Sequence, residues 1–179
     1  MNEGMKGLKT LLIVILISFV LAGLWDKVAI IKLSVGYILN PTFGNLLNFN
    51  FLFGIILISF IITLILTLLQ KFLTDQDALK NLKEEGKEIQ KKMKEFRDHP
   101  DKILELQKRQ FANLPKTFEL TMKPLVYYSI PLILFFRWFS DYFSAMGNPK
   151  IFIWFGWLGS YIIFSIVFSI ILRKLLKVH

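Results

Sequence analysis

The chain has no cysteine and only two histidines among its 179 residues. Without cysteine there is neither a disulfide framework nor a thiolate metal site. His99 lies in a charged turn and His179 is the last residue, so the sequence argues against a histidine-based metal or catalytic centre. No glycine-rich phosphate loop or nucleotide fingerprint is present either. We therefore expect no enzyme activity, no catalytic residues, no metal and no cofactor.

Long stretches of the chain also lack charge. Of the 35 charged residues, 23 lie between Lys71 and Lys123. Phe49 to Leu69 is a run of 21 uncharged residues, and Ile151 to Leu172 is a run of 22. About 20 apolar residues, rising ~1.5 Å each, cross a hydrocarbon core of ~30 Å. The sequence predicts an all-α integral membrane protein with a charged domain between its spans.

The net charge of +9 is not the signature of a nucleic-acid-binding protein. The charged block holds 13 basic and 10 acidic residues, so it is mixed and not a basic stripe. Retention of lysine and arginine on the cytoplasmic side explains the excess better. We expect the lipid bilayer as the environment and no DNA partner.

The N-terminal part is ambiguous. The apolar run from Thr10 to Leu24 suits the core of a signal peptide or a short, tilted membrane helix. We favour a retained membrane segment over residues 1–25. Residues 26–48 mix apolar residues with lysines and turn formers, which predicts an interfacial segment on the outer surface that ends in a turn.

The first core span is predicted over residues 49–72. Ser59, Thr63, Thr67 and Gln70 recur along it at helical spacing, which places all four on one face. Two interpretations stay open: packing against another helix, where small hydroxyl residues are common, or a polar lining.

A charged helical hairpin is predicted over residues 73–114. Apolar residues at alternating spacings of three and four are typical of a coiled coil, and a second stripe follows Pro100, which suits the first turn of a helix. The chain would thus form an antiparallel coiled coil. The two stripes are Leu79, Leu82, Gly86, Ile89, Met93 and Phe96, and then Ile103, Leu106, Phe111 and Leu114.

After the hairpin, Pro115 and Pro124 mark the return to the membrane. Residues 115–146 are predicted as an amphipathic approach followed by the second core span. Asn148 and Pro149 suit the start of the third core span, residues 150–172. Residues 173–179 form a basic tail. With the hairpin and tail in the cytoplasm, every junction obeys the positive-inside rule, which predicts a multi-pass protein of the cell (plasma) membrane.

Arg137 lies inside the predicted second core span, where a charge is costly unless it faces water or a partner. One alternative is that its long side chain snorkels outward and pairs with Asp141, one turn away. The other is that it faces a wet groove between the spans. We favour the groove.

This order of elements resembles the core of the YidC/Oxa/Alb insertase superfamily. It looks most like the archaeal YidC-like proteins and the third subunit of the endoplasmic-reticulum membrane complex. The likeness covers roughly residues 46–177 and rests on architecture. It implies a three-span core with a groove that receives hydrophobic segments of new membrane proteins. The groove charge of the archaeal and eukaryotic branch would correspond to Arg137.

We therefore predict an insertase or chaperone that binds nascent membrane proteins in a polar intramembrane groove. The alternative is a non-catalytic, membrane-anchored scaffold whose coiled-coil hairpin binds a partner subunit. Contact with the ribosome is a further prediction. The predicted groove residues are Arg137, Ser59, Thr63, Thr67 and Gln70, and the predicted ribosome contacts are Lys91, Lys92, Arg97, Lys108, Arg109, Arg173, Lys174 and Lys177.

Overall fold

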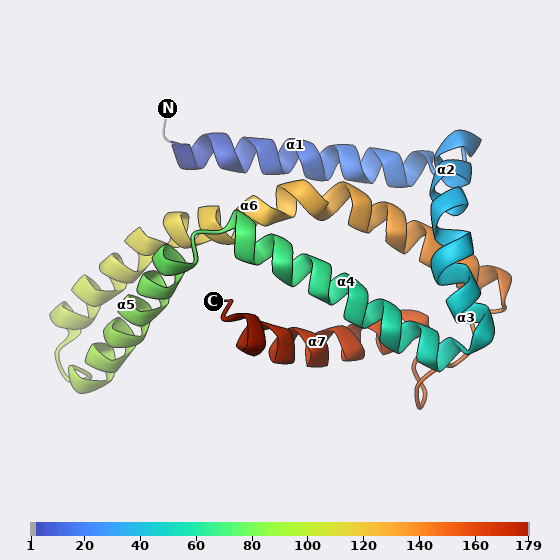
Figure 1. Cartoon of the computed structure of the whole chain (residues 1–179). Coiled ribbons are helices and arrows are strands. Elements are labelled where there is room, and N and C mark those ends of the chain that lie inside the picture. Colours follow the sequence, from blue (N-terminus) through green and yellow to red (C-terminus); the bar gives the residue numbers. More distant parts are fainter. Residues whose placement is uncertain (1–2, 179) are drawn as a thin grey trace.

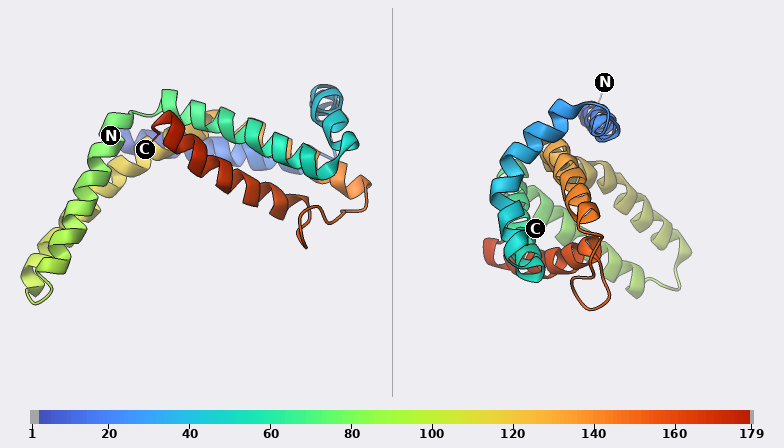
Figure 2. Two further views of the ribbon diagram at one scale, coloured as in Figure 1. Left: turned by 60° about the horizontal axis from the view of Figure 1, so that its bottom comes forward. Right: turned by 90° about the vertical axis from the view of Figure 1, so that its right-hand side faces the viewer.

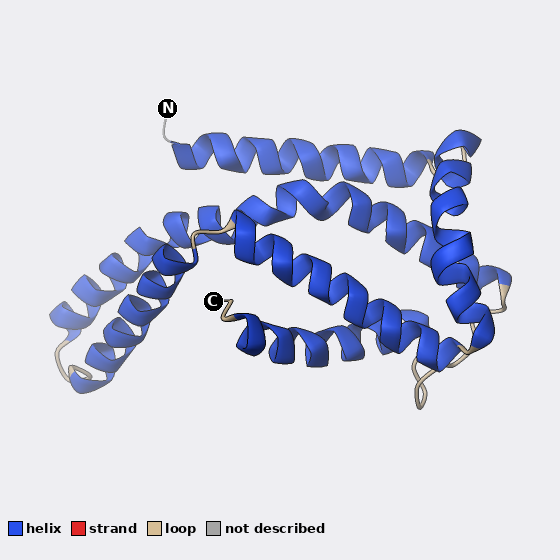
Figure 3. Cartoon of the chain, in the orientation of Figure 1, coloured by secondary structure: helices blue, strands red, loops and turns tan. Residues whose placement is uncertain are grey.

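The computed structural model describes the backbone of residues 3–178 and the side chains from Lys9 to Val178. Residues 1–2 of the expected N-terminal segment and residue 179 of the expected tail lie outside it. The described part is helical throughout, with short loops and one isolated bridge (Figure 3). The elements are α1 Glu3–Leu24, α2 Ala29–Leu39, the π-helix η1 Asn40–Gly44, α3 Asn45–Phe49, α4 Phe51–Leu73, α5 Gln76–Glu95, α6 Pro100–Ala145 and α7 Trp157–Leu176.

Four long helical stretches run side by side along roughly one axis: α1, α4, the second half of α6, and α7 (Figure 1). The segment from α2 through α3 crosses one end of this bundle. At the other end, α5 and the first half of α6 form an antiparallel pair that leaves the bundle at an angle (Figure 2, left). The start of α1 and the end of α7 lie at this same end of the bundle.

Two helices are long and apolar enough to cross a membrane, namely α4 and α7. A third candidate among the described residues is a pair of helical stretches, Lys9–Leu24 and Ala29–Phe49. Together they are long and apolar enough to cross a membrane, but they are bent by 95° at the break between them. The predicted second core span is not one of them. It forms the second half of α6, where Arg137 and Asp141 interrupt the apolar sequence.

The prolines do not interrupt the helix between the hairpin and the bundle, because α6 is one helix of 46 residues with Pro115, Pro124 and Pro131 inside it. An internal proline removes one backbone hydrogen bond and normally weakens a helix. Pro124 has no N–H to give to the carbonyl of Leu120. The Thr74 hydroxyl, at the end of α4, donates to that carbonyl at 3.2 Å instead. Tertiary contact thus replaces the local bond.

The start of the third span also differs from the prediction. Helix α7 begins at Trp157, not near residue 150. Gly147 and Asn148 have positive φ (78° and 51°), so Asn148 does not cap a helix with Pro149 in its first turn. A tight loop follows in which Phe152 and Phe155 form the isolated bridge. Residues 150–156 therefore lie outside the helix although their sequence is largely apolar.

Where a turn was predicted at the end of residues 26–48, the chain forms the π-helix Asn40–Gly44, which leads directly into α3. In the helix pair at the other end, Leu79 and Ile89 are buried as expected. Phe111 and Leu114, predicted on the facing stripe, are instead 67% and 51% exposed. Helix α6 continues past Pro115, and Leu120, beyond that proline, is buried.

The core is concentrated at the α2–α3 end of the bundle. Rings of α6 pack edge-to-face against rings of α7 there, as in Phe139 against Trp157 at 5.2 Å and Phe136 against Tyr161 at 5.2 Å. The bundle is thus packed with aromatic side chains at the end away from the hairpin. The buried cluster consists of Trp25, Leu47, Ile55, Ile58, Phe135, Trp138, Phe139, Phe143 and Tyr161.

Candidate functional site

A groove of about 390 Å³ lies between α4 and α7, with one wall residue from α6. We call it the polar groove. The hydroxyl, amide and guanidinium groups in its lining come from residues at helical spacing on both long helices. Its lining residues are Thr63, Leu66, Thr67, Gln70, Tyr128, Tyr161, Ile162, Ser165, Ile166, Ser169, Ile170 and Arg173.

The polar side of the groove lies deep, and its rim is apolar. Thr63 and Thr67 of α4 are buried, and the Thr67 hydroxyl donates to the Thr63 carbonyl at 2.7 Å. Ile166 and Ile170 of α7 are 55% and 66% exposed. The groove therefore offers hydroxyl oxygens inside and apolar side chains where it opens.

A positive charge stands at the hairpin end of the groove. Arg173, in the last turn of α7, donates from Nη2 to Oε1 of Gln70 in the last turn of α4, at 2.9 Å. This hydrogen bond joins the two helices where the groove reaches the end of the bundle. The arrangement suits a polar or acidic peptide flank, because the guanidinium retains further donors for a carboxylate.

Of the five predicted groove residues, Thr63, Thr67 and Gln70 line the groove. Ser59 does not, although it lies on the same face of α4. It is fully buried, and its hydroxyl has no hydrogen-bond partner among the described residues. Ser59 lies beside Ile58, where the aromatic core closes the space between the helices.

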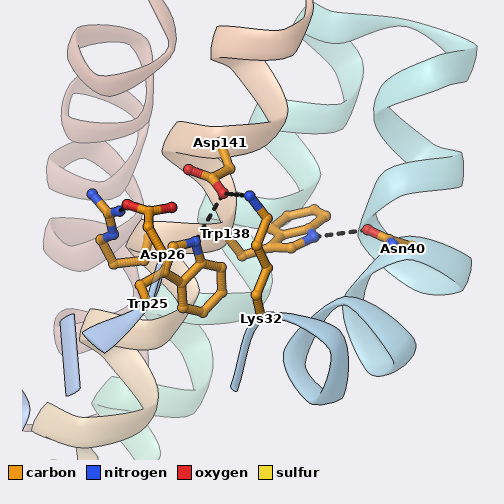
Figure 4. Close-up of polar contacts among 7 residues, drawn as sticks. Trp25, Asp26, Lys32, Asn40, Trp138 and Asp141 are labelled. Atoms are coloured by element: carbon orange, nitrogen blue, oxygen red, sulfur yellow. Dashed lines mark hydrogen bonds and ion pairs between the residues drawn. The ribbon is translucent and has the colours of Figure 1, made fainter. Parts of the chain in front are cut away.

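Arg137 also lies outside the lining of the polar groove. Its Nη2 donates to Oδ2 of Asp26 at 2.7 Å, and Asp26 lies in the connection between α1 and α2. Asp141 instead pairs with Lys32 of α2 at 2.5 Å and accepts from Nε1 of Trp25 at 2.8 Å (Figure 4). The structure therefore supports neither expectation for Arg137. Its actual partner is 111 residues away in sequence, so helical spacing within the span had no bearing on it.

A comparison with protein families gives a match to the model described as integral membrane protein EMC3/TMCO1-like, over residues 37–151. The chain belongs to the EMC3/TMCO1-like family. That family is part of the Oxa1/YidC/ER membrane complex insertase-related superfamily. The same comparisons find no match among curated proteins and none among solved structures.

The family match covers the α4 side of the polar groove but not the α7 side. It includes α4 and α6, and it ends before α7. The sequence reasoning missed Ser165, Ser169 and Arg173 of this EMC3/TMCO1-like protein, which supply polar groups to the groove from α7. Their spacing of i, i+4 and i+8 is the same signal that singled out the face of α4, and it was available in the sequence.

The predicted ribosome contacts of this EMC3/TMCO1-like protein fall into two groups. Arg109 pairs with Glu85 across the helix pair at 3.0 Å, and Arg173 is bound to Gln70. All eight are exposed, and the six outside these two contacts are Lys91, Lys92, Arg97, Lys108, Lys174 and Lys177. Contact with the ribosome remains a prediction. Within the part of the chain that the structure describes, no three histidine, cysteine or acidic residues are grouped as metal ligands.

Proposed function

We propose that this EMC3/TMCO1-like membrane protein is an insertase or chaperone that receives hydrophobic segments of nascent membrane proteins in the polar groove. The observation that carries the proposal is a groove lined by hydroxyl groups, with Arg173 at the hairpin end, between the two helices apolar enough to span a bilayer. Membership of an insertase-related superfamily supports it.

The physical task is to move the polar flank of a segment through hydrocarbon. An unsatisfied backbone or side-chain polar group costs several kcal/mol in a bilayer. The hydroxyls of Thr63, Ser165 and Ser169 would provide temporary hydrogen-bond partners. The apolar part of the segment would leave past Ile166 and Ile170 into lipid. Such a path lowers a barrier and needs neither a cofactor nor a covalent step.

We place the hairpin end of the bundle in the cytoplasm. The α5–α6 pair and the C-terminal turn with Arg173 and Lys174 lie at that end (Figure 1). Lysine and arginine are retained on the cytoplasmic side of membranes. The groove would then open toward newly made chains. A plasma-membrane location, the archaeal branch and a three-span core are parts of the same proposal.

Site-specific photo-crosslinking tests the groove. A photoreactive residue at Ser169 should form adducts with a nascent membrane segment in reconstituted vesicles, and Thr67 should behave likewise. Val167 is the matched control, because it lies on the same helix, is 47% exposed and is not in the lining. Equal adduct formation at Ser169 and Val167 would mean that the segment only passes through the surrounding lipid, and would refute the groove.

A scaffold acting through the hairpin is the second candidate, and one observation favours it. Leu104, Phe111 and Phe118 of α6, each seven residues apart, are 53%, 67% and 43% exposed, which is typical of a helix face that binds another helix. Changing Leu104 and Phe111 to serine should abolish function if the protein is a scaffold. An insertase should lose little by this change and much more when Ser169 is replaced by leucine.

A further inference from the structure

The helices of the bundle associate as two pairs. Helix α6 packs mainly along α1, and α4 packs mainly along α7. Contact between α4 and α6 is narrow by comparison. Between them lies an apolar crevice of about 290 Å³. Leu66 and Tyr128 line both this crevice and the polar groove. The position of α6 therefore determines how far Tyr128 stands from α4.

Two ion pairs attach α6 to the N-terminal segment. Asp26 accepts from Arg137, and Lys32 pairs with Asp141 one helical turn further along α6. Trp25, which is fully buried, donates to the same Asp141 carboxylate. Figure 4 shows Trp25 and Lys32 converging on Asp141. We call the four charged residues Asp26, Lys32, Arg137 and Asp141 the latch. Their charges cancel, and each acid faces a base across the contact.

The two sides of the latch differ in their relation to the family. Arg137 and Asp141 lie inside the region that the family model matches. Asp26 and Lys32 precede residue 37, where the match begins, as does all of α1. The segment formed by α1 and the first part of α2 thus packs along α6 and is also joined to the family region by ion pairs at Arg137 and Asp141.

We propose that Arg137 and Asp141 are positioning residues. Through the latch they hold α6 against the N-terminal segment, and so they set the width of the apolar crevice between α4 and α6, which we call the seam. Tyr128 is the α6 residue that this positions at the groove. The proposal rests on the proposed function in one respect, because it takes the polar groove as the site where a segment binds. Its test contains no nascent segment, so the test can fail without affecting the proposed function.

The absence of native cysteine allows a direct measurement. The double variant Leu66→Cys with Tyr128→Cys places one cysteine on each side of the seam. The rate at which a short bis-maleimide cross-links them in reconstituted vesicles, here called the seam rate, reports the distance between α4 and α6. Phe60→Cys with Phe168→Cys reports the α4–α7 pair, whose two rings lie 5.3 Å apart, and serves as the control. Both cysteine pairs are combined with Asp26→Arg, with Arg137→Asp, and with the two changes together.

Each single reversal places like charges opposite each other, releases α6 from the N-terminal segment, and should change the seam rate severalfold, with the control rate unchanged. The exchanged pair restores opposite charges and should recover most of the original rate. An unchanged seam rate in the single reversals, or no recovery in the exchanged pair, overturns the proposal. If a reversal also changes the control rate, Asp26→Asn is measured with both cysteine pairs, because it removes the attraction without adding repulsion. It should change the seam rate and leave the control rate as it was, and an unchanged seam rate overturns the proposal.

Discussion

Replacement of Arg173 by glutamine tests whether the charge at the groove end recognises acidic flanks. Two unit charges ~6 Å apart interact by ~0.7 kcal/mol in water and by ~3 kcal/mol at an effective dielectric constant of ~20. Arg173 is exposed, so solvent screens it and the effect belongs near the lower figure. A loss of ~1 kcal/mol corresponds to a roughly fivefold slower insertion of a segment with an aspartate flank. Arg173→Lys should retain much of the rate.

The assay compares insertion of two segments into reconstituted vesicles, one with an aspartate flank and the other with asparagine at the same position. Only the aspartate segment should respond to Arg173→Gln, and added salt should reduce the difference. Lys174→Gln is the matched control, because Lys174 is the next residue, carries the same charge and does not line the groove. Equal losses from Arg173→Gln and Lys174→Gln, or equal losses for both segments, would refute the reasoning.

Three further predictions concern stability and binding. Gly54→Ala should lower stability by ~1–3 kcal/mol, seen as a lower melting temperature in detergent, because its Cβ would lie 2.9 Å from Leu47 Cδ2 and 3.1 Å from Leu47 Cα. Thr74→Val should cost ~1–3 kcal/mol by leaving the Leu120 carbonyl without a donor. In a Pro124→Ala background, where the backbone regains an N–H, the same change should cost measurably less. Binding to purified ribosomes should weaken steeply with salt if the exposed lysines and arginines contact RNA phosphates, and absence of binding at low salt would end that prediction.

Sequence reasoning found one half of the candidate groove. A repeat of polar residues every four positions indicates one face of a helix, and Thr63, Thr67 and Gln70 do share the groove. It missed Arg173, because a basic residue at the end of a span is expected as a retention charge in any case. The spacing of Arg173 from Ser165 and Ser169 does indicate a shared helix face. It does not distinguish a retention charge from one that is bound to Gln70 across a groove.

The helical class, the long apolar segments α4 and α7 and the charged block between them are readable in the sequence, because they depend on composition and on periodicity within one helix. How the prolines of α6 and the charge of Arg137 are accommodated depends on contacts between distant parts of the chain. The carbonyl freed by Pro124 is bonded by Thr74, and Arg137 is neutralised by Asp26. Both partners are far away in sequence, and a buried or membrane-embedded polar group is stable only where such a partner is brought to it.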